Sequence, residues 1–409
     1  MRPWLQVVGI GEDGLAGLGQ RAQDALAGAE LIVGGRRHLS LVEDLDRPTA
    51  ARLLWRSPLG DTLAELMQHR GRPCVVLASG DPLWYGVGRL LAERVDRDEI
   101  RFLPHVSAFA LAAARLGWPI ERTVCTSVHA RPVDALRRHL TPGRRLLVLA
   151  EDEGSPAAVA GLLVALGLGG SWLQVMEHLD GPAERIVPAT AETLGEGPFA
   201  ALNLVAVEVV AGAAARPLPL VPGLPDDSFR HDGQITKAEI RAATLARLAP
   251  LPGQTLWDIG AGAGSIAIEW LRAAPGARAL AVERDPARCR NILDNARSLG
   301  VPELELVEGE APGCLGPLPA PDAAFVGGGG RDARLLEACL ERLRPGGRLV
   351  VNVVTLDAER TLLDLHARAG GDLVRLQVSR ALPIGGVTGW RPGMPVTQLT
   401  LVKPCAPGG

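Results

Sequence analysis

Asp258-Ile-Gly-Ala-Gly-Ala-Gly264 runs from the end of a strand-like segment, 255–259, into the start of a helix-like segment, 265–274. Glycines at such a turn let the backbone approach a ligand closely, and the helix N-terminus favours a negative group. The next strand-like segment ends at Glu283, whose carboxylate can accept hydrogen bonds from both hydroxyls of a ribose. The stretch therefore predicts a nucleoside-containing ligand at a strand–helix turn.

Strand-like and helix-like segments alternate through the rest of this half. Asp285 is a natural N-cap, Pro286 suits the first helical position, and Gly300 suits the helix end. Further strands are expected at 279–283, 304–307, 323–326 and 348–354. This alternation predicts an α/β fold with a parallel sheet, whose ligands bind at the carboxyl ends of the strands.

Two ligand classes fit the glycine stretch. A dinucleotide site would normally place its third glycine one residue later, at Ser265. An aspartate before GxGxG instead resembles the class I S-adenosylmethionine (SAM) methyltransferases, whose loop passes the methionine part of a zwitterionic ligand. This resemblance implies a Rossmann-like domain in which SAM contacts Gly260, Ala261, Gly262, Ala263, Gly264 and Glu283.

Two more segments match that family. Gly309-Glu310-Ala311 follows the third strand, where such enzymes hold the adenine, and Pro345-Gly-Gly347 precedes the fifth. The resemblance implies that Glu310 and Ala311 contact the cofactor. Thr236, before the first strand, is interpreted in two ways: as the N-cap of a helix, or as a contact to the SAM carboxylate.

A proline-rich run marks the clearest domain boundary. Pro217, Pro219, Pro222 and Pro225 cannot sustain a helix or a central strand. We therefore expect an N-terminal domain at 1–212, a linker at 213–227 and a C-terminal domain at 228–409, each large enough for its own core.

The N-terminal half also begins with a strand and a glycine loop. Gly9-Ile-Gly-Glu-Asp-Gly14 fits GxGxxG, which alone is weak evidence for a dinucleotide fold. The second strand ends in Gly34-Gly35, without an acid for a ribose. The glycines of this loop therefore do not indicate a dinucleotide site, and another role for them is expected.

Three later features in this half occur in a recognisable order. They are Ser79-Gly-Asp-Pro-Leu-Trp-Tyr-Gly86, Pro104-His-Val-Ser-Ala108 and Leu116-Gly-Trp-Pro119. Together with the glycine loop they resemble the tetrapyrrole methylase family, the class III SAM methyltransferases. The resemblance implies a tetrapyrrole methylase-like α/β domain whose SAM contacts are Gly9, Gly11, Asp81, Tyr85 and Ser107. Glu12-Asp13 and His105 depart from the usual Pro-Gly and Gly of that family.

A class III domain fused to a class I domain resembles the two-domain precorrin methyltransferases of cobalamin (corrin-ring) biosynthesis. The resemblance implies a bifunctional enzyme with one SAM site per domain. It would methylate C-5 and C-15 of precorrin-6B (6Y) and decarboxylate the C-12 acetate, giving precorrin-8. Alternatives are a SAM-dependent methyltransferase acting on another tetrapyrrole, a dinucleotide-dependent oxidoreductase, a nucleic-acid methyltransferase, and a SAM sensor without turnover.

Substrate contacts are predicted at four residues. Arg36 and Arg37 lie in a GGRRHL segment that resembles one in precorrin methylases, although a solvated basic turn is the alternative. Gly328 lies in a run of glycines after the fourth strand, where a planar macrocycle can approach the backbone. Arg391 is a further candidate for a substrate carboxylate. No catalytic acid or base is identified.

Composition narrows the functional classes. Hydrophobic residues are 47% and charged residues 22%, which excludes whole-chain disorder. The formal charge of -3, with 43 basic and 46 acidic residues, argues against a nucleic-acid partner bound through a basic field. The six cysteines form no CxxC pair, and His105 has no second ligand at suitable spacing, so no metal is expected.

A cytoplasmic, non-membrane protein is expected, because no signal peptide is recognised and cysteine usage fits a reducing compartment. The uncharged stretch 155–176 is long enough to span a bilayer. Its glycines at 167, 169 and 170 instead favour a helix, a turn and a strand beginning near Trp172. Assembly into a homo-oligomer is expected by resemblance to related proteins.

Overall fold

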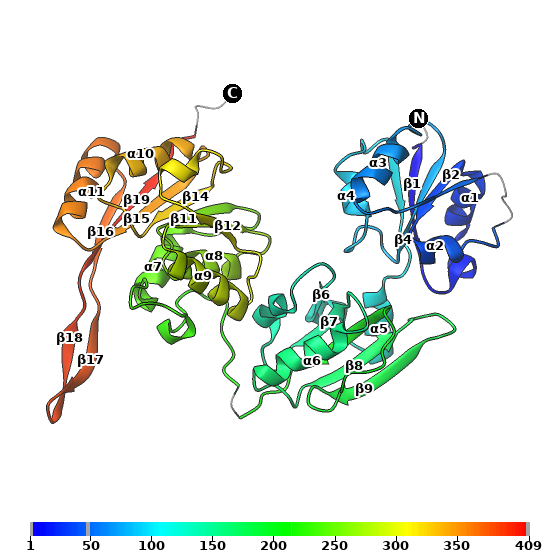
Figure 1. Cartoon of the computed structure of the whole chain (residues 1–409), viewed down its shortest axis with the longest axis horizontal. Helices are drawn as coiled ribbons and strands as arrows, with labels where there is room; N and C mark the ends of the chain where they lie inside the picture. The colour runs from blue at the N-terminus through cyan, green and yellow to red at the C-terminus, as the bar shows by residue number, and fades with distance from the viewer. Residues whose placement is uncertain (1–2, 46–49, 214, 406–409) are drawn as a thin grey trace. The chain divides into compact units, whose positions relative to one another are not determined.

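The computed structural model describes residues 3–45, 50–213 and 215–405. The chain divides into two compact units, one formed by Met1–Val133 with Thr141–Arg216 and the other by Asp134–Leu140 with Pro217–Gly409. Both units have the α/β architecture that the alternation predicted (Figure 1). Residue 214 of the predicted linker, and residues 1 and 409 at the predicted outer domain ends, lie outside the described residues.

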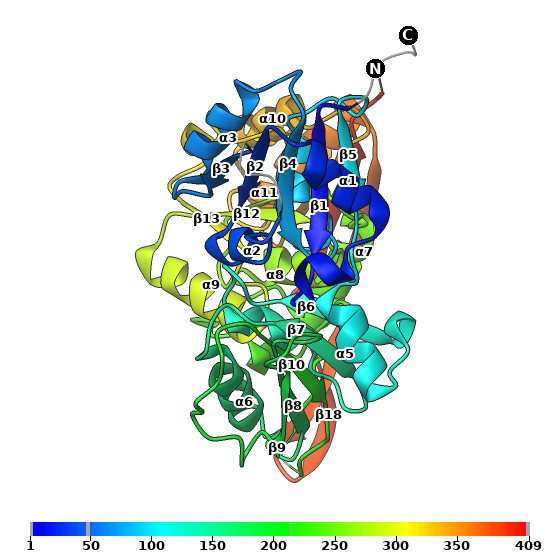
Figure 2. The ribbon, with the colours of Figure 1, turned by 90° about the vertical axis from the view of Figure 1, so that its right-hand side faces the viewer.

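The first unit begins with a parallel five-stranded sheet in the order β3-β2-β4-β1-β5 (Figure 2). Its strands are β1 (Leu5–Ile10), β2 (Leu31–Gly34), β3 (Ala51–Leu54), β4 (Cys74–Ser79) and β5 (Ile100–Leu103). Its helices are α1 (Gln20–Gly28), α2 (Arg36–Ser40), α3 (Leu59–Met67) and α4 (Gly88–Ala92). Buried alanines and a leucine of α1 pack on one face of the sheet, and buried leucines of α3 and α4 pack on the other. The carboxyl ends of β1, β4 and β5 therefore share one edge.

A second five-stranded sheet, of mixed direction, completes this unit in the order β6-β7-β10-β8-β9. Its strands are β6 (Thr123–Ser127), β7 (Arg145–Leu149), β8 (Trp172–Glu177), β9 (Arg185–Thr190) and β10 (Asn203–Glu208). The helices are α5 (Ala108–Leu116) and α6 (Ser155–Ala165). The uncharged stretch 155–176 is thus a helix, a turn and a strand, as predicted. Within the described ranges, no helix is long and apolar enough to cross a membrane.

The second unit contains a seven-stranded sheet in the order β13-β12-β11-β14-β15-β19-β16. The strands are β11 (Thr255–Ile259), β12 (Arg278–Glu283), β13 (Glu305–Glu308), β14 (Ala323–Val326), β15 (Arg348–Val353), β16 (Asp372–Leu376) and β19 (Val396–Val402). The helices are α7 (Ala238–Leu248), α8 (Ser265–Ala273), α9 (Pro286–Ser298), α10 (Ala333–Arg342) and α11 (Leu356–Ala369). The five strands from β11 to β15 are parallel, as predicted, whereas β19 is antiparallel to both of its neighbours.

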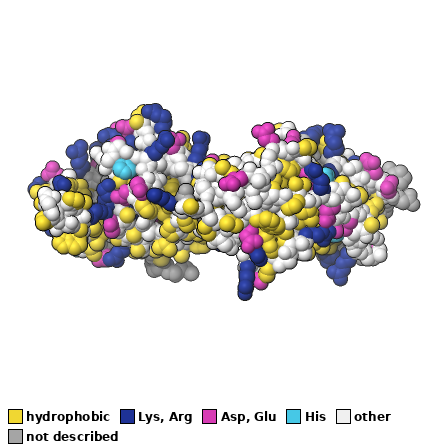
Figure 3. Space-filling view, turned by 90° about the horizontal axis from the view of Figure 1, so that it is seen from below, with side chains coloured by type: hydrophobic (Ala, Val, Ile, Leu, Met, Phe, Trp, Pro, Cys, Tyr) yellow, Lys and Arg dark blue, Asp and Glu magenta, His cyan; other side chains and the backbone are white. Residues whose placement is uncertain are grey.

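A two-stranded hairpin, β17 (Ser379–Ile384) and β18 (Val387–Pro392), leaves the seven-stranded sheet between β16 and β19 (Figure 1). Nearly all of its residues are exposed, so it adds nothing to the core. Two apolar clusters form that core, one on each face of the sheet. On the face of the molecule that Figure 3 shows, basic, acidic and hydrophobic side chains are interspersed.

Candidate active sites

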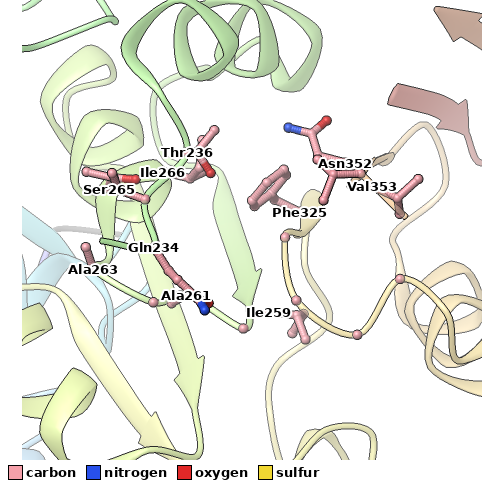
Figure 4. Close-up of a pocket in the computed structure, with 18 of the residues that line it drawn as sticks. Gln234, Thr236, Ile259, Ala261, Ala263, Ser265, Ile266, Phe325, Asn352 and Val353 are labelled. Atoms are coloured by element: carbon pink, nitrogen blue, oxygen red, sulfur yellow. The ribbon is translucent and has the colours of Figure 1, made fainter. Parts of the chain in front are cut away.

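A cavity of about 1070 Å³ opens at the carboxyl ends of the parallel strands in the second unit. Strands β11, β12, β14 and β15, the segment before α7 and the base of the hairpin line it. The lining includes residues 233–237, 259–263, 282–284, 309–311, 327–332 and 352–355. Figure 4 shows Gln234 and Thr236 on one side of the opening and Phe325, Asn352 and Val353 on the other. The sequence predicted this edge of the sheet as the ligand site.

The glycine stretch forms a cradle at one end of the cavity. Gly260, Gly262 and Gly264 all have positive φ, of 66°, 60° and 74°. A Cβ atom on Gly260 would lie 2.8 Å from the Cα of Gly328, because the loops after β11 and β14 meet backbone to backbone. The structure thus brings together the predicted cofactor loop and the predicted substrate glycine. Gly264 is the N-cap of α8 and is not among the lining residues.

Glu283 is fixed against this loop. Its Oε2 accepts a hydrogen bond from the Gly262 amide at 2.9 Å, and its Oε1 accepts from the amides of Arg284 and Asp285 at 3.0 Å each. The residue is 5% exposed and lines the cavity. This places an acceptor-only carboxylate beside the glycine cradle, as the sequence predicted.

Asp258 lies directly beneath the loop and does not line the cavity. Burial raises its pKa to about 7, against the opposing effect of a hydrogen bond from the Ala267 amide at 3.0 Å. The negative charge of Glu283 raises the same pKa further. Asp258 ties the end of β11 to the first turn of α8, so its role is to hold the loop.

Thr236 lines the cavity but does not cap a helix. Helix α7 begins at Ala238 with Lys237 at its N-cap position, so the N-cap interpretation of Thr236 is wrong by one residue. The buried guanidinium of Arg241 donates to the carbonyl oxygens of Thr236 and Leu224. It also pairs with Glu269 at 2.6 Å. The segment before α7 is therefore anchored from below by an arginine that the sequence did not single out.

The predicted adenine end also lies at the cavity. Glu310 and Ala311 line it, and the Gly309 amide donates to the Glu283 carbonyl oxygen at 2.9 Å. The Glu310 side chain is 73% exposed and pairs with Arg284 at 2.8 Å. Nothing in these contacts buries the Glu310 carboxylate, so it forms part of the rim.

The opposite end of the cavity is formed by β14, β15 and the hairpin base. Asn352 lines it and donates to the Thr244 hydroxyl at 2.8 Å, while Gln398 donates to the Asn352 side-chain oxygen at 2.8 Å. Arg331 and Arg380 line this end, whereas Arg391 does not, because β18 carries it onto the hairpin. Asn352 and the two lining arginines were missed from sequence, since no motif marks them.

In the first unit the loops after β1, β4 and β5 meet. A Cβ atom on Gly9 would lie 1.9 Å from the carbonyl oxygen of Gly80, which accepts a hydrogen bond from the His105 amide at 3.1 Å. Ser107 caps α5 by accepting from the Ala110 amide at 3.2 Å. Asp81 accepts from the Leu83 amide at 2.9 Å, which closes the turn after β4. The predicted residues of this half thus gather at one edge of the first sheet.

Tyr85 reaches from this edge to the second sheet. It has a φ of 57°, an uncommon value for a residue with a side chain. Its hydroxyl donates to the Cys125 carbonyl oxygen at 3.3 Å, and its ring centroid lies 6.0 Å from that of Phe109. Tyr85 therefore connects the β4 loop to β6.

The two predicted substrate arginines of this half differ in their surroundings. Arg37 contacts Glu12 and donates to the Ser79 hydroxyl at 2.7 Å, and Glu12 also lies 2.9 Å from a ring nitrogen of His178. Burial, followed by the charge of Arg37, lowers the pKa of His38 to about 4. Arg36 is exposed, and its side chain makes no hydrogen bond or ion pair with the described parts of the chain. Arg36 is thus the freer of the two guanidinium groups.

Comparison with known proteins shows the family of each half of the chain. Residues 5–195 match the family model described as tetrapyrrole (corrin/porphyrin) methylases, and residues 227–403 match that of a precorrin methyltransferase domain. A precorrin-6Y C(5,15)-methyltransferase (decarboxylating) of Sinorhizobium sp. is 51% identical over 401 residues, covering 98% of this chain and 97% of the relative. The chain belongs to the precorrin-6Y C(5,15)-methyltransferase (decarboxylating) family.

Other relatives carry the same or a related name. The family member of Mycobacterium tuberculosis strain CDC 1551 is 44% identical over 401 residues, covering 97% of this chain and 99% of the relative. A probable cobalt-precorrin-6B C(15)-methyltransferase (decarboxylating) of Pyrobaculum aerophilum is 37% identical over 186 residues, covering 44% of this chain and 95% of the relative. Membership of a methyltransferase family confirms the predicted use of SAM. One SAM site in each unit stays a prediction.

Proposed function

We propose that this member of the precorrin-6Y C(5,15)-methyltransferase family methylates C-5 and C-15 of precorrin-6B (6Y) and removes carbon dioxide from the C-12 acetate. The product is precorrin-8. The observation that carries the proposal is the C-terminal cavity, where the Glu283 carboxylate and the glycine cradle occupy one end and leave the other open. At about 1070 Å³ this cavity is slightly larger than ordinary ligand pockets, which measure about 300–1,000 Å³. It suits a cofactor and part of a macrocycle together.

In the second unit, the proposed SAM contacts lie at the carboxyl ends of three neighbouring strands, β13, β12 and β11, and in the segment before α7. Glu283 accepts from a ribose hydroxyl, and Glu310 and Ala311 border the adenine. The loop 260–264 passes the methionine part, and Thr236 contacts its carboxylate. These roles are supported by the lining of the cavity, although Gly264 would act through the shape of the loop.

In the first unit, we assign the second SAM molecule to the edge where three loops meet. Gly9 and Gly11 provide the close backbone approach, while Asp81, Tyr85 and Ser107 hold the neighbouring turns. Exposed Arg36 is available to a substrate carboxylate. Arg37 would have to exchange its contact with Glu12 for one with substrate.

Methyl transfer from SAM depends mainly on how the methyl group and the accepting carbon are aligned. SAM supplies a methyl group on a sulfonium, which is already strongly electrophilic. An electron-rich meso carbon forms the new C–C bond as the C–S bond breaks, and its proton is then released. In the decarboxylation, the electrons of the broken C–C bond enter the conjugated ring, and the remaining methylene is protonated. Residues that fix the two reactants in line therefore supply most of the catalysis.

Product mass tests the proposed function. The purified chain is incubated with SAM and precorrin-6B, and the pigment is analysed by mass spectrometry. We expect a gain of two methyl groups and the loss of one carbon dioxide. A gain of one methyl without that loss would leave only one unit active on this substrate. Unchanged pigment would refute the proposal, and saturation by NAD without SAM binding would favour the oxidoreductase alternative.

We further propose a cytoplasmic homo-oligomer that acts on tetrapyrroles and binds neither nucleic acid nor metal. The mixed surface charge of Figure 3 and the formal charge of -3 support the absence of a nucleic-acid partner. The β17–β18 hairpin supports self-association, because Trp390 and Val387 are 74% and 71% exposed there.

A further inference from the structure

Five cationic side chains line the C-terminal cavity, and all but one are paired with an acid. The pairs are Lys237 with Asp226, Arg284 with Glu310, Arg288 with Asp232 and Arg380 with Glu239. The remaining one is Arg331, whose guanidinium has no hydrogen-bond or ion-pair partner among the residues that the structure describes. Four of the five lining cations are thus paired with acidic side chains of the chain itself. Among the described residues, the Arg331 guanidinium is therefore the lining cation that is left to pair with an anionic ligand.

The backbone of Arg331 is held although its guanidinium is free. Its carbonyl oxygen accepts from the Thr361 hydroxyl at 3.2 Å, and the next residue, Asp332, caps α10 by accepting from the Arg334 amide at 3.0 Å. The side chain therefore projects from a fixed point directly after the glycines 327–330. This point belongs to the β14–β15 end of the cavity, whereas Glu283 and the cradle belong to the β11–β12 end.

The lining around Arg331 combines apolar side chains with the polar side chains of Asp332, Thr355 and Arg380. Phe325, Leu335 and Val353 line the same end of the cavity, and Asn352 is engaged by Thr244 and Gln398. A guanidinium recognises a carboxylate through two parallel hydrogen bonds, and such charge-assisted pairs are stronger than neutral ones. An anionic substrate at this end would therefore orient on Arg331.

We propose that Arg331 binds a carboxylate of the tetrapyrrole that is retained in the product, and that this contact orients the ring for the reactions at C-15 and C-12. The inference rests on the proposed function. A guanidinium on the departing carboxylate would stabilise the reactant more than the transition state, in which the charge has moved into the ring. The departing carboxylate is better placed against the apolar side chains of the lining, Phe325, Leu335 and Val353, which disfavour its charge.

The test is the variant Arg331→Gln in the full-length chain, with C-15 methylation and carbon dioxide release both measured. We expect KM for the macrocycle to rise about 10- to 100-fold, the usual consequence of losing a charge-assisted hydrogen bond. At subsaturating substrate, methylation and carbon dioxide release should fall by the same factor. Affinity for SAM should stay within about twofold, and Arg331→Lys should recover part of the loss.

Arg334→Gln is the matched control. Arg334 lies one turn away, its side chain is 87% exposed, and it does not line the cavity. We expect its KM and both rates to match those of the wild type. Arg331 is itself exposed, so SAM binding and the circular-dichroism spectrum should confirm that Arg331→Gln is folded.

Two results would overturn the assignment. An unchanged KM for the macrocycle in Arg331→Gln would show that Arg331 does not bind substrate. A selective change in carbon dioxide release, with C-15 methylation intact, would place Arg331 on the departing carboxylate instead. If the wild-type chain neither methylates C-15 nor releases carbon dioxide, the proposed function fails rather than the role of Arg331.

Discussion

Glu283 has its two oxygen atoms oriented by the backbone before a cofactor binds. Three amide groups donate to them, one from the glycine loop and two from the residues that follow Glu283. A carboxylate can accept about four hydrogen bonds, so capacity remains for a ribose hydroxyl. The same side chain therefore holds the loop and presents an acceptor to the cavity.

We expect Glu283→Gln to weaken SAM binding in the second unit by about 10- to 100-fold. A glutamine has only one acceptor oxygen, so its NH2 group would face either the Gly262 amide or the amides of Arg284 and Asp285. Each lost charge-assisted bond costs about 1.5–3 kcal/mol. Calorimetric titration with SAM, read together with C-15 methylation, measures the effect.

Glu305→Gln is the control for this prediction. Glu305 lies on the neighbouring strand β13 and makes an exposed ion pair with Arg278, so its loss should leave SAM binding unchanged. Wild-type SAM affinity and C-15 methylation in Glu283→Gln would contradict the ribose role.

Site residues that belong to a sequence motif could be predicted, whereas residues whose role depends on their burial in the fold could not. Glu283 was found because an acid at the end of the second strand has a known use. Arg241 was missed because the sequence has 43 basic residues and nothing shows which is fully buried. Its partners Glu269 and Asp226 are distant in sequence, so only the folded chain brings them together.

At the scale of elements, the loops after β11 and β14 are held in backbone contact. Gly260 and Gly262 both have φ near 60°, so an added Cβ is strained at either position. Only at Gly260 would that atom also meet backbone, 2.8 Å from the Gly328 Cα. At Gly262 the nearest atom is the Gln234 carbonyl oxygen, at 3.7 Å. A substitution at Gly262 therefore tests backbone strain alone, whereas one at Gly260 adds a collision with the backbone of the β14 loop.

We expect Gly260→Ala to abolish SAM binding in the second unit, and Gly262→Ala to weaken it by about tenfold or less. The difference arises because Gly260→Ala must push the β14 loop away, whereas Gly262→Ala costs about 1 kcal/mol of backbone strain. Binding isotherms and C-15 methylation of the two variants provide the measurement. Equal losses would show that the contact between the loops is not needed for the site.

In the second unit, the parallel strands β11 to β15 were predictable and the strands that follow them were not. Segments 255–259 and 323–326 coincide with β11 and β14, because buried apolar runs between turns mark central strands. Strands β16 to β19 were not predicted. The hairpin strands are exposed on both faces and contain glycine and proline, so they lack the alternation that marks a half-buried strand.

At the scale of the whole molecule, the exposed hairpin bears on assembly. We expect light scattering after size-exclusion chromatography to give a multiple of 43.0 kDa for the wild type. Trp390→Ser combined with Val387→Ser should lower that mass, because it removes apolar surface that is exposed in the single chain. Both residues lie outside the cavity lining.

Val402→Ser is the control, since Val402 is a 60% exposed apolar residue on β19 in the same unit. Its mass should equal that of the wild type. A wild-type mass of one chain would refute the predicted homo-oligomer. An unaltered oligomer in the double variant would move the interface away from the hairpin.

The division of the chain at Arg216 and Pro217 has a consequence for gene expression. Because one polypeptide carries both units, every round of translation yields them in a fixed one-to-one ratio. A cell that makes the two activities as separate proteins must match their synthesis and turnover by regulation. Here the stoichiometry is set by the covalent connection itself, and a change in promoter strength alters both activities together.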